Sequence, residues 1–217
     1  MTSSTRPDVP RLHVITNDEI AARPDFISHA TSIMEACAGA VAFHLRLKRA
    51  RAHTLYDLAE TLTGVARRTN TALYLNERID VAVAAGATGV QLTASSIPVS
   101  AATSWRYSGV ALVIGYSAHG VAEAMSAESD GADFVILGTI WSSGTHPGEC
   151  TAGIDLITAA SERLSIPVVA IGGVTPSRAQ EALLAGAHGV AAIAGIWDAE
   201  VPAKAATNYL NAMQDVR

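Results

Sequence analysis

Three short stretches of the 217-residue chain share one pattern and decide the fold: AGATGV at 85–90, DGADFV at 130–135 and AGAHGV at 185–190. Each places a glycine after an amphipathic segment and a valine within the apolar run that follows. Glycine ends helices well because it adopts the left-handed backbone conformation without a penalty from Cβ. The three stretches therefore predict a helix-to-strand unit that recurs along the chain.

The same alternation of short apolar runs and longer helical segments extends outward from these stretches to both ends of the chain. Leu55, Leu58 and Leu62, for example, have helical spacing between two apolar runs. Eight alternations predict the α/β class and a parallel sheet that closes into a single (β/α)8 TIM barrel over 11–217. The polar residues 1–10, with two prolines, are expected to form a disordered tail. The expected strands are 12–16, 40–47, 72–75, 89–92, 111–114, 134–137, 167–171 and 189–193.

Composition excludes several classes of protein. The net charge is −5 and Lys and Arg form no block, so neither nucleic acid nor a membrane surface is an expected partner. No apolar run reaches the about 18 residues that a membrane span needs. Cys37 and Cys150 lack metal-like spacing and are expected to be free thiols of a cytoplasmic protein. With 5% aromatic residues, the core is expected to consist mainly of small aliphatic side chains.

Glycine turns follow the last two expected strands, at the end of the barrel where active sites lie. Gly172 and Gly173 precede a helix start at Thr175. Ala194 and Gly195 follow the final strand. Backbone N–H groups in such turns bind phosphate, so the two turns predict a phosphate site. The alternative interpretation is that these tight turns need glycine for their backbone conformation alone.

Three polar side chains alternate along the second expected strand. His44, Arg46 and Lys48 would all point to the same face. Such a face would be costly inside an apolar core unless the side chains reach a ligand or solvent. We interpret the face as a ligand-binding one. The alternative is a solvated outer face.

Other polar residues follow the remaining strands. His119 comes just after the fifth expected strand, and an imidazole can both give and take a proton near neutral pH. We expect it to be catalytic, although it could instead cap the next helix. Asn76 and Ser117 are further candidate ligand-binding residues. The loop 142–148 is rich in hydroxyl groups, so Thr145 could cover a phosphate, while His146 could equally be an exposed loop residue.

Seven segments, in this order, give the chain a resemblance to the thiamine phosphate synthase/TenI superfamily over nearly its full length. The resemblance implies a (β/α)8 barrel, a place in thiamine metabolism and a homodimer. The segments are LHVITND (12–18), FHLRLK (43–48), YLNERIDVAVAAGATGVQLT (74–93), IGYSAHG (114–120), GADFVILGTIWSSGTHPG (131–148), PVVAIGGVTP (167–176) and GAHGVAAIAGI (186–196).

The synthase branch of this superfamily joins a pyrimidine diphosphate to a thiazole phosphate and needs Mg²⁺. The sequence departs from the synthase pattern at three positions. Glu77 stands where the pattern has aspartate, Ser96 stands where it has an acidic residue, and His146 stands where it has lysine. Because Mg²⁺ and diphosphate need carboxylate ligands and cationic groups, we expect no metal and no cofactor.

The TenI branch catalyses a cofactor-free tautomerisation that aromatises a thiazole carboxylate phosphate. His119 matches the catalytic histidine of this branch, and the loop with Thr145 resembles it more than the synthases. We therefore expect a thiazole tautomerase whose ligand is a small phosphorylated thiazole. Arg46 and Lys48 would contact the carboxylate or phosphate, and the two glycine turns would hold the phosphate. The alternatives are a diverged thiamine phosphate synthase and a catalytically silent ligand-binding relative.

Overall fold

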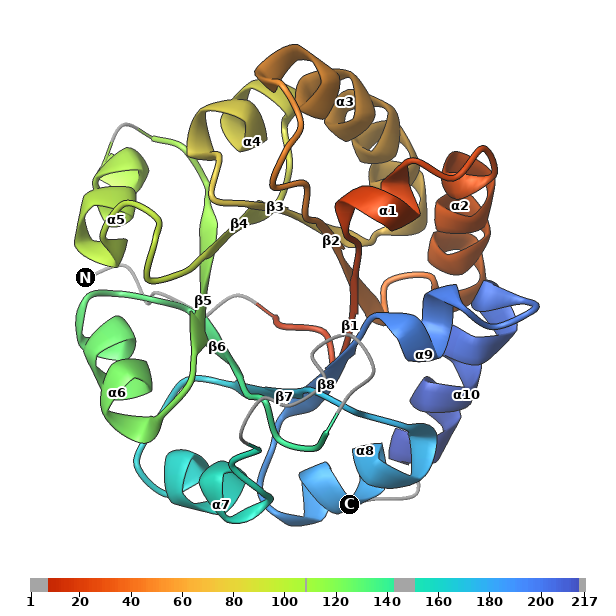
Figure 1. The fold of residues 1–217 in the computed structure, drawn as a ribbon. Helices are drawn as coiled ribbons and strands as arrows, with labels where there is room; N and C mark the ends of the chain where they lie inside the picture. Colours follow the sequence, from red (N-terminus) through yellow and green to blue (C-terminus); the bar gives the residue numbers. More distant parts are fainter. Residues whose placement is uncertain (1–7, 108, 143–150, 215–217) are drawn as a thin grey trace.

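The fold is a closed barrel of parallel strands surrounded by helices (Figure 1), which confirms the predicted (β/α)8 barrel. The structure, a computed structural model, describes residues 8–107, 109–142 and 151–214. Each strand pairs with its neighbours in chain order, and β1 pairs with β8 to close the ring. The strands are β1 (Leu12–Ile15), β2 (Val41–Leu45), β3 (Ala72–Asn76), β4 (Gly89–Leu92), β5 (Val113–Ala118), β6 (Phe134–Leu137), β7 (Val168–Ile171) and β8 (Gly189–Ala192).

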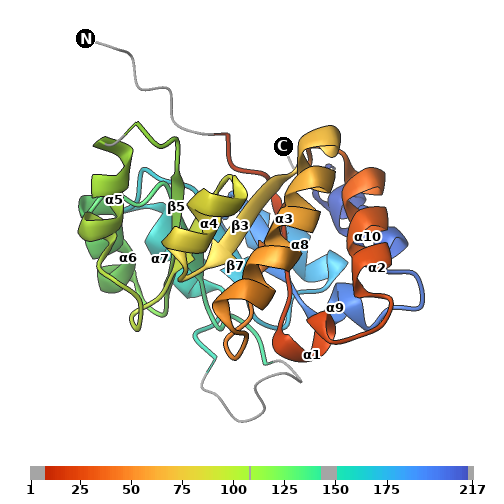
Figure 2. The same ribbon diagram turned by 90° about the horizontal axis from the view of Figure 1, so that it is seen from above.

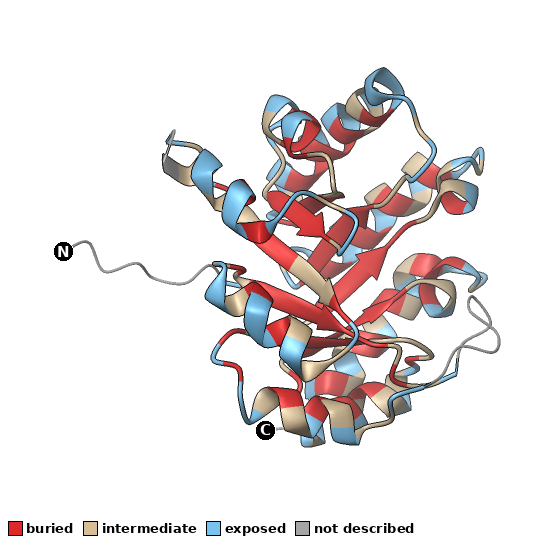
Figure 3. Ribbon diagram, turned by 60° about the vertical axis from the view of Figure 1, so that its left-hand side comes forward, coloured by how far each residue is buried: buried red, intermediate tan, exposed pale blue. Residues whose placement is uncertain are grey.

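The helices lie outside the barrel and bury their apolar faces against it. Figure 3 shows this as buried strands at the centre and exposed residues on the outer faces of the helices. Within the described residues, no helix is long and apolar enough to cross a membrane. The helices are α1 (Asp18–Ala21), α2 (Phe26–Cys37), α3 (Ala52–Thr69), α4 (Ile79–Ala85), α5 (Val99–Tyr107), α6 (Val121–Ser129), α7 (Asp155–Ser161), α8 (Pro176–Leu184), α9 (Ala194–Trp197) and α10 (Pro202–Gln214).

The three repeated stretches form helix-to-strand connections, as predicted. Gly86, Gly131 and Gly186 have φ values of 68°, 101° and 100°, in the region that favours glycine. The N–H of Gly86 donates to two carbonyl groups at the end of α4. The recurring glycines therefore end the helices in the conformation that the sequence pattern requires.

Two expected strands have different bounds in the structure. β2 ends at Leu45, because the next residues leave the ladder and the N–H of Arg46 donates to Thr16 Oγ1 at 3.0 Å. β5 runs over Val113–Ala118 instead of 111–114. Its later residues pair with β4 and β6 although they do not form an apolar run. Hydrogen-bonded pairing with the neighbouring strands sets both boundaries, and the sequence pattern does not show this pairing.

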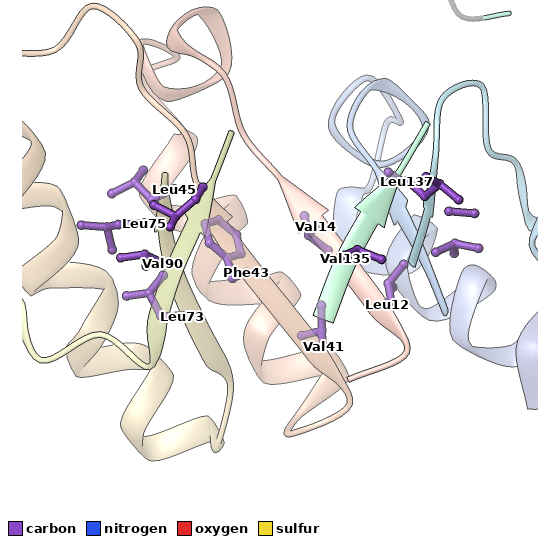
Figure 4. Packing of buried hydrophobic residues seen from close by; sticks show 14 of the residues in the cluster. Leu12, Val14, Val41, Phe43, Leu45, Leu73, Leu75, Val90, Val135 and Leu137 are labelled. Carbon is purple, nitrogen blue, oxygen red and sulfur yellow. The ribbon is translucent and has the colours of Figure 1, made fainter. Parts of the chain in front are cut away.

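Alternate residues of each strand divide the core into two parts. One face packs against the helices through aliphatic side chains such as Val14, Leu45 and Leu75 (Figure 4). The other face fills the interior of the barrel with a second cluster that includes Val9, Ala42 and Val169 among its smaller members. Of the described residues of the expected tail, Val9 is buried against this cluster, Pro10 is half-buried and Asp8 is exposed.

The centre of the barrel is aromatic, which differs from the expected core of small aliphatic side chains. His13, His44, Tyr74 and Phe134 lie together, with His44 stacked on Tyr74 at 4.9 Å between ring centroids. Gly115 leaves room for this group, because a Cβ there would lie 2.3 Å from the Phe134 ring. Two of the eleven Phe, Tyr and Trp residues of the chain, Tyr74 and Phe134, thus share the barrel interior with two buried histidines.

Candidate active site

The loops that follow the strands form one end of the barrel, which we call the mouth. Figure 2 shows α1 and α9, which follow β1 and β8, at this end. The described N-terminal residues approach the barrel from the opposite end. The sequence-predicted site residues that the structure describes belong to strand ends and loops on the side of the mouth.

The three polar residues of the second expected strand do not share one strand face. His44 lies in β2 and is completely buried inside the barrel. Arg46 and Lys48 follow the end of the strand, where Arg46 is half-buried and Lys48 is exposed. The predicted alternation was therefore right in pointing His44 inward and wrong in continuing the strand beyond Leu45.

The carboxylate of Asp18 binds the backbone of the loop that follows β2. Its oxygens accept hydrogen bonds from the backbone N–H groups of Lys48 at 3.1 Å and Arg49 at 3.0 Å. The side chain of Arg49 pairs with Glu19 at 2.9 Å. By contrast, neither Arg46 nor Lys48 has a carboxylate partner among the described residues. Two cations at the mouth are therefore available to an anionic ligand.

The glycine turns after β7 and β8 are tightly packed. A Cβ at Gly173 would lie 2.4 Å from the carbonyl oxygen of Ser142, and one at Gly195 would lie 2.3 Å from the hydroxyl of Tyr209. That hydroxyl donates to the carbonyl of Val174 at 2.7 Å, which ties α10 to the β7 turn. The conformational need for glycine is thus real, and phosphate binding at these turns stays a prediction.

Two further expectations concern these turns. Gly172 has a φ of 102°, which favours glycine. Thr175 is the N-cap of α8, as expected, and accepts a hydrogen bond from the N–H of Arg178. Ala194 is the first residue of the short helix α9 and is half-buried beside Gly195.

His119 follows β5 and is exposed at the mouth. Its Nδ1 lies 2.7 Å from the carbonyl oxygen of Gly138 at the end of β6. Because a carbonyl only accepts hydrogen bonds, Nδ1 carries the proton and Nε2 of the neutral ring has a free lone pair. The backbone N–H of His119, just before α6, donates to the carboxylate of Glu123 in the first turn of that helix at 2.8 Å. The imidazole is therefore oriented by strand β6 and is not the helix cap.

Ser117 and Asn76 belong to strands and not to loops after them. Ser117 lies in β5, where its hydroxyl accepts a hydrogen bond from Gln91 Nε2 at 2.9 Å. Asn76 is the last residue of β3, in register with Gln91 of β4. Its Oδ1 is buried and has no partner among the described residues. The two predicted residues and Gln91 therefore form a polar layer on adjoining strands.

Two acidic groups follow β3 at this mouth, Glu77 and Asp80. Glu77 Oε1 accepts a hydrogen bond from Thr93 Oγ1 at 3.0 Å, and Ser96 Oγ accepts from the N–H of Thr93 at 2.9 Å. The guanidinium of Arg78 binds both carboxylate oxygens of Asp80, which lowers the pKa of that carboxyl group. Within the described ranges, no group of three or more His, Cys, Asp or Glu residues could hold a metal.

Two candidate residues, Thr145 and His146, lie outside the described residues. One residue of the barrel interior was missed from the sequence. His13 lies in β1, is completely buried, and makes a hydrogen bond with His44. The alternation of LHVI over 12–15 could have indicated it, because His13 and Ile15 share one face of their strand.

Comparison with known proteins assigns the family. The sequence model of the family described as "Thiamine monophosphate synthase" matches residues 12–196. A thiamine-phosphate synthase of Chlorobium luteolum is 35% identical over 97% of this chain and 96% of its own. A thiamine-phosphate synthase of Pyrococcus furiosus is 30% identical over 95% of this chain and 96% of its own.

A solved structure agrees with the sequence comparison. The thiamine phosphate pyrophosphorylase from Pyrococcus furiosus superposes with a TM-score of 0.83 at 30% identity, covering 95% of this chain and 96% of that one. The two sequence relatives are named thiamine-phosphate synthase, and neither they nor the solved structure carries the name of the tautomerase. The chain belongs to the thiamine monophosphate synthase family.

Proposed function

We propose that the protein is a thiamine-phosphate synthase, the transferase that was the alternative to the tautomerase in the sequence analysis. The single observation that carries this proposal is a pair of cations at the mouth, Arg46 and Lys48, for which the described part of the chain offers no carboxylate partner. A pyrimidine diphosphate and a thiazole phosphate both bring negative charge to this mouth. The names of the relatives that span nearly the whole chain support the same reaction.

The proposed reaction joins the two rings and releases diphosphate. Arg46 and Lys48 would neutralise the charge that develops on the departing diphosphate. The N–H groups of Gly173 and Gly195 would hold the phosphate of the thiazole, as proposed from the sequence. Closely spaced binding of the two substrates would supply much of the rate enhancement, because positioning alone lowers the barrier of a two-substrate reaction.

The donor groups at the mouth fit Mg²⁺ only together with the substrate. Proteins often hold Mg²⁺ through one or two carboxylates and the phosphates of the substrate. Glu77 would be the carboxylate here, with the hydroxyl groups of Thr93 and Ser96 nearby. When bound, the ion would neutralise diphosphate charge. Ser96 in place of an acidic residue predicts that the enzyme needs more Mg²⁺ than an enzyme with two carboxylates.

Two substitutions test these assignments in an assay for thiamine phosphate formation. Arg46→Ala is expected to raise the KM for the pyrimidine diphosphate about 10-fold or more, because a charged hydrogen bond is lost. Arg49→Ala is the matched control, since Arg49 is exposed and pairs with Glu19. Ser96→Asp is expected to lower the Mg²⁺ concentration for half-maximal rate about 10-fold. Equal effects of the two arginine substitutions would contradict the role of Arg46.

A second candidate function, the thiazole tautomerase, is favoured by the orientation of His119. Its Nδ1 is fixed on the carbonyl of Gly138, so Nε2 is presented as a base without any metal. In a tautomerisation, one proton is taken from a carbon atom and a proton is returned to the ring at another position. This activity would be retained in EDTA, whereas the synthase activity would be lost.

A further inference from the structure

Two histidines form a hydrogen-bonded chain in the centre of the barrel. His13 Nδ1 lies 2.8 Å from His44 Nε2, and His13 Nε2 lies 3.0 Å from the carbonyl oxygen of Pro10. Both side chains are completely buried. Neither histidine of this pair has a role in the proposed reaction.

The direction of each hydrogen bond follows from the carbonyl at the end of the chain. The oxygen of Pro10 only accepts, so His13 Nε2 carries a proton. Burial lowers the pKa of His13 to about 3 and that of His44 well below its ordinary value, so both rings are neutral at pH 7. Neutral His13 therefore accepts at Nδ1, and His44 must donate from Nε2.

This arrangement leaves His44 Nδ1 as a hydrogen-bond acceptor. The atom is buried and has no partner among the described residues. The ring cannot turn freely to find another one, because it is stacked on Tyr74 with an interplanar angle of 20°. A buried acceptor without a donor is costly, so the atom requires a donor from a ligand or from water.

Two more buried acceptors lie on the next strands of the barrel interior. Asn76 Oδ1 on β3 and Gln91 Oε1 on β4 also have no partner within the part of the chain that the structure describes. Asn76 and Gln91 are in register, and Asn76 is two residues beyond Tyr74, the register partner of His44. Acceptors from three consecutive strands thus line one side of the interior beneath the mouth.

We propose that His13 is a positioning residue that fixes His44 in the tautomer with an unprotonated Nδ1, so that the barrel interior selects a ligand that brings an N–H or O–H donor. The position of the proton rests on the hydrogen bonds of His13 with Pro10 and His44 and on the neutrality of both rings, and not on the identity of the ligand. The identity of the ligand rests on the proposed function. Two separate experiments therefore test the two parts.

The tautomer is measured in the ligand-free, full-length protein by ¹⁵N NMR of the histidine side chains. The wild-type protein is expected to show His44 protonated at Nε2 only. His13→Phe removes the acceptor and is expected to give a mixture of His44 tautomers. His13→Asn returns an acceptor oxygen near the position of Nδ1 and is expected to restore the wild-type signal. His44 protonated at Nδ1 in the wild-type protein would overturn the proposal.

Ligand recognition is measured by titrating thiamine phosphate into the same labelled samples. The ¹⁵N signal of His44 Nδ1 is expected to shift on binding, and His13→Phe is expected to weaken binding about 10-fold or more, with His13→Asn close to wild type. Val169→Ala, which removes buried volume from the interior cluster and leaves both histidines in the chain, is the control and is expected to bind normally. Binding that leaves the His44 signal unchanged would overturn the inference. No binding to the wild-type protein would overturn the proposed function instead.

Discussion

Acid should destabilise this barrel through its buried histidines, and the size of the effect follows from the structure. Burial lowers the pKa of His13 to about 3, whereas an unfolded histidine has a pKa near 6.5. Between these two values the unfolded chain binds a proton that the folded chain does not. Stability is therefore complete above about pH 6.5 and falls as the pH is lowered toward 3.

The expected loss for His13 alone is about 2 kcal/mol at pH 5, because 1.5 pH units below the unfolded pKa correspond to about 1.4 kcal/mol each. His44 acts in the same direction, since burial also lowers its pKa. The loss is a large part of the 5–15 kcal/mol that typically stabilises a folded domain.

Urea unfolding at several pH values between 5 and 8 measures the effect. The wild-type free energy of unfolding should fall toward pH 5, and that of His13→Phe should fall by about 2 kcal/mol less. His53→Gln, a substitution of an exposed histidine on α3, is the control and should follow the wild type. Parallel curves for the wild type and His13→Phe would refute the reasoning, because His13 would then titrate equally in both states.

Three further expectations concern catalysis, packing and assembly. His119→Asn should lower any tautomerase turnover about 100-fold or more without lowering the melting temperature, and a fully active variant would remove His119 from that mechanism. Gly115→Ala should cost about 1–3 kcal/mol in urea unfolding, because its Cβ would lie 2.2 Å from Gln91 Oε1. Gly64→Ala, whose Cβ would meet no atom within 4 Å apart from its chain neighbours and the backbone of its own helix, should not destabilise α3. Light scattering should give the mass of two 22.5 kDa chains, and the mass of one chain would contradict the homodimer.

Much of the fold could be predicted because local chemistry determines it. Gly86, Gly131 and Gly186 end helices through their backbone conformation, which a sequence displays directly. The bounds of β2 and β5 could not be predicted, because pairing with neighbouring strands determines where each ladder stops. The same holds for the aromatic centre of the barrel, which depends on the register of strands far apart in sequence.

The candidate site could be predicted in location but not in detail. His44 and Asn76 were found because polar residues near the ends of barrel strands are easy to recognise. His13 was missed although the alternation over 12–15 places it on the face of Ile15, because its partner His44 lies on another strand, 31 residues further along the chain. The assignment of the branch was the weakest part. Ser96 argued against the synthase, while the relatives that span nearly the whole chain carry the name of the synthase.

Identification of the product by mass spectrometry distinguishes the synthase from the tautomerase. The purified protein is incubated with the pyrimidine diphosphate, the thiazole phosphate and Mg²⁺, and in parallel with the thiazole carboxylate phosphate tautomer in EDTA. The account predicts thiamine phosphate in the first reaction, formed in equal amount with released diphosphate and abolished by EDTA. Aromatisation in the second reaction, with no thiamine phosphate formed in the first, would contradict it.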